Sequence, residues 1–317
     1  MSTSFDRTTE VRGAGTVSRN SVQFFDQSSI EVTPNVEFND LMVAGYGKID
    51  ETIADALIEV AFNPVGFITA AILAELYPAA YLTPVIDASI FGATDVPADI
   101  HSMLGKKLTL HNTAITKMPS LKLGAQEDVF QGGAQITGLI KNSTARSAAD
   151  SVFTLADAAW AGTITRANHK RLSYTGTWNS LTIVAQESWQ VDFDLSLNPR
   201  KTDDIGTYDM GMGGLVVRAR CRPVSLAETI LNYRNLQANA NAAIGASPRL
   251  TQDLTIVSDA VGGITVVLKD AIMKEGPCRW GENELRAGEI GFEASRDLTG
   301  ALPGAIASVG VTEDEEE

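Results

Sequence analysis

Polar and apolar positions alternate over two long stretches of the chain, and both stretches alternate in the same phase. In the first stretch, apolar side chains occupy the even-numbered positions from Val32 to Phe38, with polar side chains between them. In the second, apolar side chains occupy the odd-numbered positions from Val191 to Leu197. A period of two is typical of a β-strand with one buried face. We therefore predict a two-faced strand in each stretch.

The two stretches belong to a longer repeat. Residues 22–64 align without a gap on residues 181–223, which lie 159 positions later. The identical positions are Gln27/Gln186, Ser29/Ser188, Val32/Val191, Asn39/Asn198, Gly47/Gly206, Asp50/Asp209 and Pro64/Pro223. A shift of one residue would exchange the two faces of a strand. The shared phase therefore supports an internal duplication more strongly than the identities do.

A helix is predicted after each copy of the repeat. The first spans 66–76, where Asn63 is the expected N-cap and Pro64 occupies the first helical position. The second spans 226–236, where Ser225 begins a capping-box pattern.

Further strands follow each predicted helix, in 106–124 and 132–140 of the first copy and in 262–281 and 286–294 of the second. The predicted fold class is mainly β. Each unit is a β-sandwich or barrel with one flanking helix, and two such units are arranged in tandem.

The predicted boundaries are an N-terminal arm at 1–20, a first β domain at 21–141, a connector at 142–170, a second β domain at 171–300 and an acidic C-terminal tail at 301–317. The Ala-rich connector is expected to pack against a neighbouring unit. The tail ends in five consecutive acidic residues, which repel one another and favour disorder.

Composition limits the classes of function. The 317 residues, 44% of them hydrophobic, suffice for two cores of ordinary domain size. A net charge of −14 disfavours a protein that clamps nucleic acid, although nucleic acid could pass such a surface without binding. Cys221 and Cys278 align with Phe62 and Leu121, which predicts small buried apolar groups rather than a disulfide or a metal pair. The N-terminal residues do not resemble a secretory signal.

One segment is apolar enough to be tested as a membrane span. Residues 65–86 are apolar with the exceptions of Thr69, Glu75 and Thr83, and Pro78 and Pro84 interrupt them. A membrane-spanning helix needs about 20 predominantly apolar residues. A short helix docked on a sheet, followed by a buried loop, is the better interpretation, and we expect no membrane insertion.

Patterns that carry catalytic chemistry are absent from the sequence. His101, His111 and His169 have no metal-ligand spacing. The glycines at 211, 213 and 214 lack the Lys-Ser/Thr that completes a phosphate loop. Asp192 and Asp194 share one strand face, where a solvated polar face is a better interpretation than a metal site. We expect no enzyme activity, no metal and no cofactor.

Charge differs between the copies on the strand that precedes each predicted helix. The first copy has Glu59 where the second has Arg218, which Arg220 and Arg222 follow on the same face. One interpretation is unrelated drift of surface residues. The other is that units lie side by side in a ring and that these faces meet at the interfaces, where complementary charge fixes the choice of partner.

The run SIEVTPNVEFNDLMVAGYG (29–47), followed by a long strand into Asn63-Pro64, resembles the tail tube proteins of long-tailed bacteriophages. The resemblance covers roughly 21–141 and, more weakly, 181–300. It consists of a β-sandwich with one flanking helix, long alternating strands and the Tyr46-Gly47 turn. The second copy has Ile205 in place of Tyr46.

This resemblance implies a non-enzymatic virion protein that is assembled in the host cytoplasm. Units of the family form six-fold rings that stack into a tube around a DNA channel, so two fused units imply trimeric, pseudo-hexameric rings. The implied partners are other copies of the chain, the tape measure protein and other tail proteins, with phage DNA passing through without specific binding. The residues expected to line the channel are Glu31, Glu37, Asp192 and Asp194.

Two alternatives remain. A tail-tip or baseplate hub protein can be built from duplicated tube units and would occur in few copies. A two-domain β-sandwich binding module, for example for carbohydrate, would need an exposed aromatic platform. The tryptophans do not cluster in the sequence, which disfavours the binding module.

Overall fold

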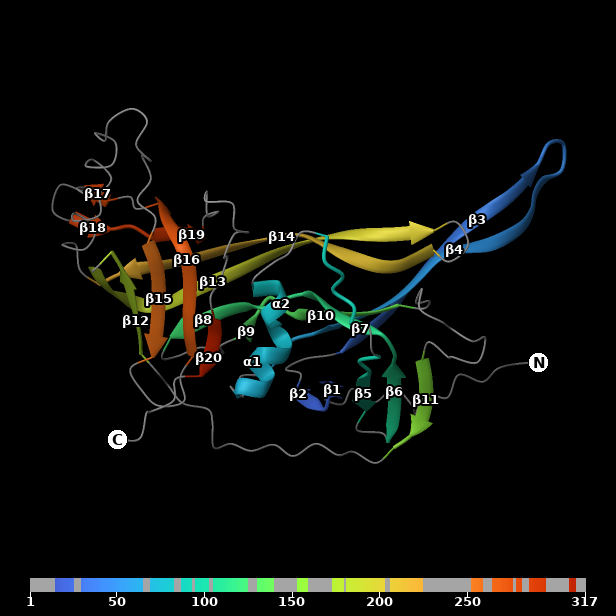
Figure 1. The fold of residues 1–317 in the computed structure, drawn as a ribbon, viewed down its shortest axis with the longest axis horizontal. Helices are drawn as coiled ribbons and strands as arrows, with labels where there is room; N and C mark the ends of the chain where they lie inside the picture. The colour runs from blue at the N-terminus through green and yellow to red at the C-terminus, as the bar shows by residue number, and fades with distance from the viewer. Residues whose placement is uncertain are drawn as a thin grey trace.

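The computed structural model describes residues 15–25, 30–64, 69–82, 87–92, 95–102, 105–124, 130–139, 153–158, 173–179, 181–202, 206–224, 252–258, 264–275, 278–280, 285–294 and 308–311. Within these ranges the protein is mainly β, as predicted, with several antiparallel sheets and two short helices (Figure 1).

Strands of the C-terminal half form a closed sheet. Its members are β12 (Tyr174–Trp178), β13 (Leu181–Thr202), β14 (Gly206–Pro223), β15 (Gln252–Ser258), β16 (Ile264–Glu275) and β19 (Ile290–Ala294). Pairing runs β12–β15–β16–β19–β14–β13 and returns to β12. Each of these six strands thus pairs with two neighbours in the closed part, beyond which the β13–β14 hairpin extends as two strands. We call this part, together with β17 (Cys278–Trp280), β18 (Leu285–Ala287) and β20 (Ser308–Val311), the second unit.

Inside the closed sheet, aromatic side chains fill the core. The ring of Phe292 lies 5.4 Å from that of Trp178 and 6.3 Å from that of Trp189, measured between centroids. All three side chains are buried. A Cβ on Gly176 would lie 2.3 Å from the Trp189 ring, so only glycine leaves room for the indole there.

The N-terminal half, the first unit, has two sheets. One has the order β11–β6–β5–β1–β2 and the other β3–β4–β10–β7. The strands are β1 (Gly15–Arg19), β2 (Val22–Phe25), β3 (Glu31–Val43), β4 (Gly47–Phe62), β5 (Ala98–Ser102), β6 (Lys106–Leu110), β7 (Thr113–Lys117), β8 (Ser120–Gly124), β9 (Phe130–Gln131), β10 (Ala134–Leu139) and β11 (Phe153–Asp157). Figure 1 shows the tip of the β3–β4 hairpin projecting away from the remaining strands.

Strand register repeats between the two units. All thirteen residue pairs of β3–β4, from Glu31–Ala61 to Val43–Gly47, recur in β13–β14 at positions 159 higher. The register shifts also recur, after Glu37 and Leu41 in the first hairpin and after Ser196 and Arg200 in the second. The equal phase of the two sequences therefore corresponds to equal pairing in space. The apolar face is buried in β13 at Val191 and Phe193, whereas no residue of β3 is buried.

Other pairings repeat as well. β2 and β3 together match the single strand β13, while β6 and β7 match β16. Ile136 pairs with Val60 in the first unit as Phe292 pairs with Ala219 in the second. The hairpin turns end in Gly47 (φ 76°) and Gly206 (φ 74°), a left-handed conformation that glycine adopts without strain.

Three strands lie outside the unit boundaries that the sequence predicted. β1 falls in the expected N-terminal arm, β11 in the connector and β20 in the C-terminal tail. β11 pairs with β6 as β20 pairs with β16, so each unit ends with an added edge strand. These short strands lack the long alternation by which β3 and β13 were recognised.

The helix of the first unit begins later than predicted. α1 spans Ala70–Leu76, and Thr69 caps it by accepting a hydrogen bond from the backbone nitrogen of Ile72 at 3.2 Å. A second short helix, α2, spans Ala79–Leu82. Pro64 forms an isolated bridge instead of a first helical turn. The helix predicted over 226–236 lies outside the described residues.

Glu75, the acid in the apolar run, is buried against Arg19. The two side chains are 10% and 11% exposed and form an ion pair. Arg19 also donates to the hydroxyl of Thr113 at 3.1 Å and to its carbonyl at 2.9 Å. Burial lowers the pKa of Arg19. In the part of the chain that the structure describes, no helix has the length and apolar character that crossing a bilayer requires.

Candidate assembly surface

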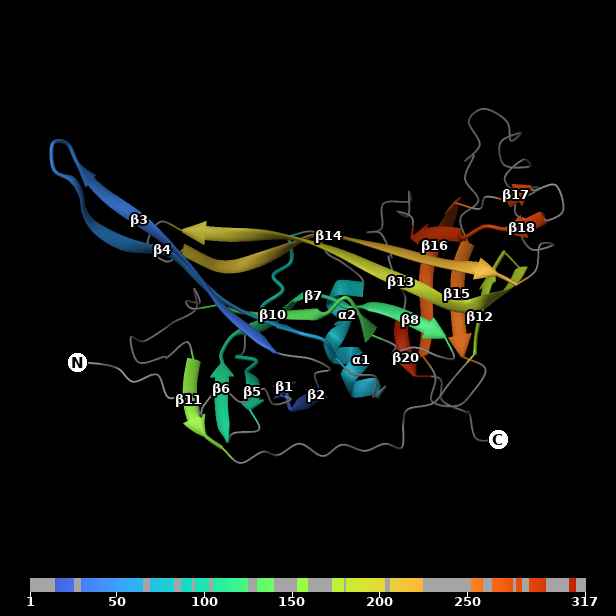
Figure 2. The ribbon, with the colours of Figure 1, turned by 180° about the vertical axis from the view of Figure 1, so that it is seen from behind.

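The two units are joined by a strand that passes from the first to the second. β8 of the first unit forms a hairpin with β9 and also pairs with β13 of the second unit (Figure 2). Leu123 lies opposite Trp189, and Leu121 lies opposite Val191. A Cβ on Gly124 would lie 2.6 Å from the carbonyl oxygen of Glu187, so glycine permits this close approach. The contact between units is therefore a continuous sheet as well as a packed surface.

The tip of the second hairpin lies on the middle of the first. Asp55 in β4 is 5% exposed and accepts hydrogen bonds from the Thr207 backbone nitrogen (2.9 Å) and hydroxyl (2.6 Å) in β14. Lys201 in β13 lies 2.8 Å from Asp55 and 3.2 Å from Glu37. One lysine thus joins two carboxylates of the other unit.

Ionisation of Asp55 reflects these contacts. Burial alone raises the pKa of its carboxyl group. The hydrogen bonds from Lys201 and Thr207 stabilise the carboxylate and together outweigh burial, so the pKa of Asp55 lies below its usual range. The same ion pairs raise the pKa of Lys201.

A cleft of about 280 Å³ remains between the two hairpins. The first unit lines it with Asn35, Glu37, Asp55, Leu57, Glu59, Thr116, Gln135 and Thr137, and the second with Leu197, Pro199, Lys201, Thr207 and Met210. Charged, polar and apolar side chains all line this space.

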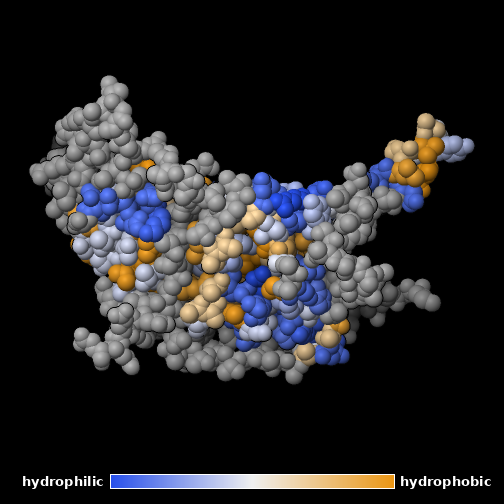
Figure 3. All heavy atoms as spheres, in the orientation of Figure 1, coloured by the Kyte–Doolittle hydropathy of each residue, from blue (hydrophilic) through white to orange (hydrophobic). Residues whose placement is uncertain are grey.

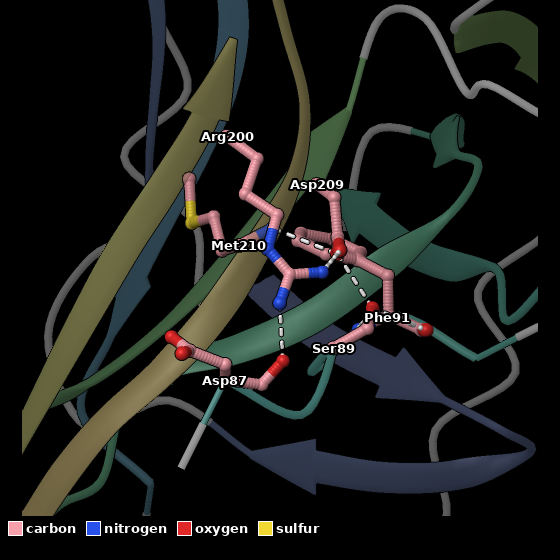
Figure 4. A network of polar contacts seen from close by, with 6 residues as sticks. All are labelled: Asp87, Ser89, Phe91, Arg200, Asp209 and Met210. Atoms are coloured by element: carbon pink, nitrogen blue, oxygen red, sulfur yellow. Dashed lines mark hydrogen bonds and ion pairs between the residues drawn. The ribbon is translucent and has the colours of Figure 1, made fainter.

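A third contact involves the segment after α2. The backbone of Ser89 bridges to Gly211 in β14, and the Ser89 hydroxyl lies 2.5 Å from the Asp209 carboxylate. Arg200 donates to Asp209 at 2.8 Å and to the Asp87 carbonyl (Figure 4). This network of the first unit's loop and the second unit's hairpin fixes the direction in which the second hairpin extends.

Apolar packing accompanies the polar contacts. The ring of Tyr77, at the end of α1, lies 4.7 Å from the ring of Phe193 in β13. The Tyr77 hydroxyl donates to the Pro119 carbonyl at 2.8 Å. Burial raises the pKa of Tyr77 well above its ordinary value. The buried side chains of both units form one continuous core.

In contrast, the tip of the first hairpin is apolar and uncovered. Its large exposed apolar side chains are Phe38, Leu41, Met42, Val43, Tyr46 and Ile49. Tyr46 is 84% exposed and Met42 63%. Figure 3 shows hydrophobic residues gathered on the projecting end of this hairpin. An apolar patch of this kind marks an interaction surface.

The residues predicted to line a channel occupy polar strand faces. Glu31 and Asp194 are exposed, and Asp192 accepts a hydrogen bond from Gln190 at 2.9 Å. Glu37 is joined to Lys201 across the contact between units. The structure therefore gives Glu37 a role in that contact, while channel lining by Glu31, Asp192 and Asp194 stays a prediction.

Glu59 and Arg218 are not brought together within one chain. Glu59 lines the cleft beside the second hairpin, whereas Arg218 bonds to Glu293 of its own unit at 3.0 Å. Arg220 lies 3.6 Å from both Asp192 and Glu289. Arg222 is exposed. A meeting of these charges between chains stays a prediction.

The sequence interpretation missed the contact that Asp55 makes with Thr207 and Lys201. Alignment at an offset of 159 places Glu37 on Ser196, Asp55 on Gly214 and Met42 on Lys201. Many other aligned positions also differ in charge, so nothing in the sequence singled out these residues.

Within the described ranges, no group of three or more His, Cys, Asp and Glu side chains could hold a metal ion. Cys221 is buried, in agreement with the sequence interpretation. The chain matches no protein-family model, and no curated protein is similar to it in sequence.

Proposed function

We propose that this protein is a structural subunit of a bacteriophage tail tube, which assembles with copies of itself into stacked rings. The observation that carries the proposal is the strand pairing between units. The hairpins of the two units have the same register, and β8 of the first unit extends the sheet of the second. A unit that extends its neighbour's sheet can be repeated around a ring.

Three chains would supply six units to each ring. The long hairpins would be arranged around a channel for DNA during ejection, and the tape measure protein and other tail proteins would be further partners. The acidic character of the chain, −14 in net charge, suits a channel that repels phosphates. No catalytic step is required of such a subunit.

Negative-stain electron microscopy of the purified full-length chain tests the proposal. We expect rings with three-fold symmetry and six lobes, together with hollow tubes formed by stacked rings. Single rings that never stack, at any concentration or salt, would indicate a tail-tip hub protein instead. A chain that stays monomeric under the same conditions would contradict self-assembly and favour a two-domain binding module.

A further inference from the structure

We infer that a second copy of this chain binds the free edge of β3, with β17–β18 of one chain occupying the place on β3 that β8–β9 occupies on β13. The inference rests on the proposed self-assembly and specifies which strands form the contact between chains. Its basis is the contact between units that each chain already contains.

The donor strands are equivalent. In the first unit, Ser120 pairs with Gln131 and Leu121 with Phe130. In the second, Cys278 pairs with Ala287 and Arg279 with Arg286. β8 uses its other edge to pair with β13, whereas among the described residues β17 pairs with β18 alone. β17 is therefore a strand with an edge available for a partner.

The acceptor strands are equivalent too. β3 and β13 pair with β4 and β14 in the same register. On the opposite edge, Gln190 and Val191 are covered by Lys122 and Leu121, whereas β3 is the terminal strand of its sheet in the part of the chain described. An uncovered edge is a template for strand addition. Because Cys278 aligns with Leu121, transfer of the β8–β13 register places Glu31 opposite Arg279 of the neighbouring chain and Ile30 opposite Trp280.

The same repetition accounts for the exposed apolar hairpin tip. Within a chain, the tip of the second hairpin lies on Glu37 and Asp55 of the first unit. In the next contact, the tip of the first hairpin would lie on the equivalent residues, Ser196 and Gly214, of a neighbouring chain. A Cβ on Gly214 would meet no atom within 4 Å, and Val216 beside it is 37% exposed. Neither Ser196 nor Gly214 carries a charge, and the space above Gly214 is open where Met42 would arrive.

Charge explains why the two contacts are not interchangeable. Lys201 meets two carboxylates within the chain. Met42 would replace it between chains, where neither carboxylate is present. If the hairpin tip that carries Lys201 lay on Ser196 and Gly214, the lysine would have no carboxylate partner. If the tip that carries Met42 lay on Asp55, the buried carboxylate would have no lysine partner. Both mismatches are unfavourable, so the units alternate and the chains join head to tail.

Disulfide cross-linking tests this register. In a Cys278→Ser background, we would combine Glu31→Cys with Arg279→Cys and oxidise the assembled protein. Facing residues of antiparallel strands lie about 4.5–5.5 Å apart, within the range of a disulfide. We expect a ladder of covalent dimers and trimers on a non-reducing gel, ending at a closed ring. Ile30→Cys with Trp280→Cys is a second pair in the same register.

The matched control is Asn35→Cys with Arg279→Cys, which moves one cysteine four residues, about 13 Å, along the strand. Rings that form without cross-linking of either facing pair would overturn this inference and leave the proposed function standing. Cross-linking of the control pair in place of the facing pairs would also overturn it. A chain that forms no rings at all would contradict both proposals.

Substitution of the hairpin tip is an independent test. Met42→Lys adds a charge where the tip would meet Gly214 and Val216, and we expect it to abolish rings while the folded monomer remains. Thr182→Lys, on an exposed face of β13, is the control and should assemble normally. Rings formed by Met42→Lys as readily as by the control would contradict the placement of the tip.

Discussion

Asp55 in β4 accepts two hydrogen bonds from one residue of the other unit, Thr207 in β14, at 2.9 Å from its backbone nitrogen and 2.6 Å from its hydroxyl. The carboxylate is nearly fully buried and also lies 2.8 Å from Lys201. One side chain therefore satisfies a backbone donor, a hydroxyl and an ammonium group at the contact between the hairpins.

We expect Asp55→Ala to destabilise the chain by about 3 kcal/mol, because it leaves buried donors without an acceptor. Chemical denaturation monitored by circular dichroism would measure the loss. Glu37→Ala is the matched control, since Glu37 is an exposed partner of the same lysine and should cost less than about 1 kcal/mol. Equal effects of the two substitutions would contradict the role assigned to Asp55.

The contact of Asp55 with Thr207 and Lys201 should weaken in acid. The folded pKa of Asp55 lies below that of an unfolded aspartate, about 3.9. Its contribution is therefore complete above the unfolded pKa and disappears as the pH falls through the folded pKa. Stability measured between pH 7 and pH 3 should fall less in Asp55→Asn than in the wild type. Parallel profiles would show that Asp55 does not contribute this pH dependence.

Gly176 and Gly214 should respond differently to the same change. Gly176→Ala would place a methyl group 2.3 Å from the Trp189 ring, and we expect it to cost about 1–3 kcal/mol through overpacking. Gly214→Ala meets no atom within 4 Å and should leave the melting temperature of the monomer unchanged. A neutral Gly176→Ala would mean that Trp189 packs differently.

Arg19 in β1 and Glu75 in α1 form a buried ion pair. Removal of one partner leaves the charge of the other uncompensated. We expect Arg19→Ala to destabilise by about 3–5 kcal/mol. Arg218→Ala removes an exposed pair with Glu293 and should cost less than about 1 kcal/mol. Thermal melts of the two variants provide the comparison, and a mild effect of Arg19→Ala would count against a buried pair.

Channel lining can be tested on Asp192. If its face borders the DNA path, Asp192→Lys should leave tubes intact but slow the release of DNA, because lysine attracts phosphates. Asp253→Lys, on β15, is a charge-matched control outside that face. Release kinetics in virions carrying each variant would be compared. Equal kinetics in the two variants would remove Asp192 from the channel.

The sequence predicted both long strands because alternation over many residues constrains pairing and register. The predicted buried face is present in the second stretch, where Val191 and Phe193 are buried. The prediction of a buried face was wrong for the first stretch, where Pro34 and Phe38 are exposed and Val32 and Val36 only half-buried. The equal turns at Gly47 and Gly206 followed from the alignment. Long periodic strands leave few alternative pairings, so their arrangement was accessible without coordinates.

The short strands and the contacts between units could not be predicted from the sequence. Five residues in β11 or four in β20 carry too little periodicity to be recognised. The placement of β8 on β13 depends on tertiary packing and on the small size of Gly124. In the sequence, Asp55 cannot be distinguished from the exposed polar residues of a strand face. It is buried only because the second hairpin covers it.

The pairing of β8 with β13 also has a consequence for the kinetics of assembly. A protein with one unit per chain must form every contact between neighbours by diffusion and collision. In the proposed ring, every second contact would form while the polypeptide folds, since covalent linkage gives the two units a high effective concentration. Only half of the contacts between units would then form between separate chains, and each chain would present one donor and one acceptor edge where two separate units would present two of each.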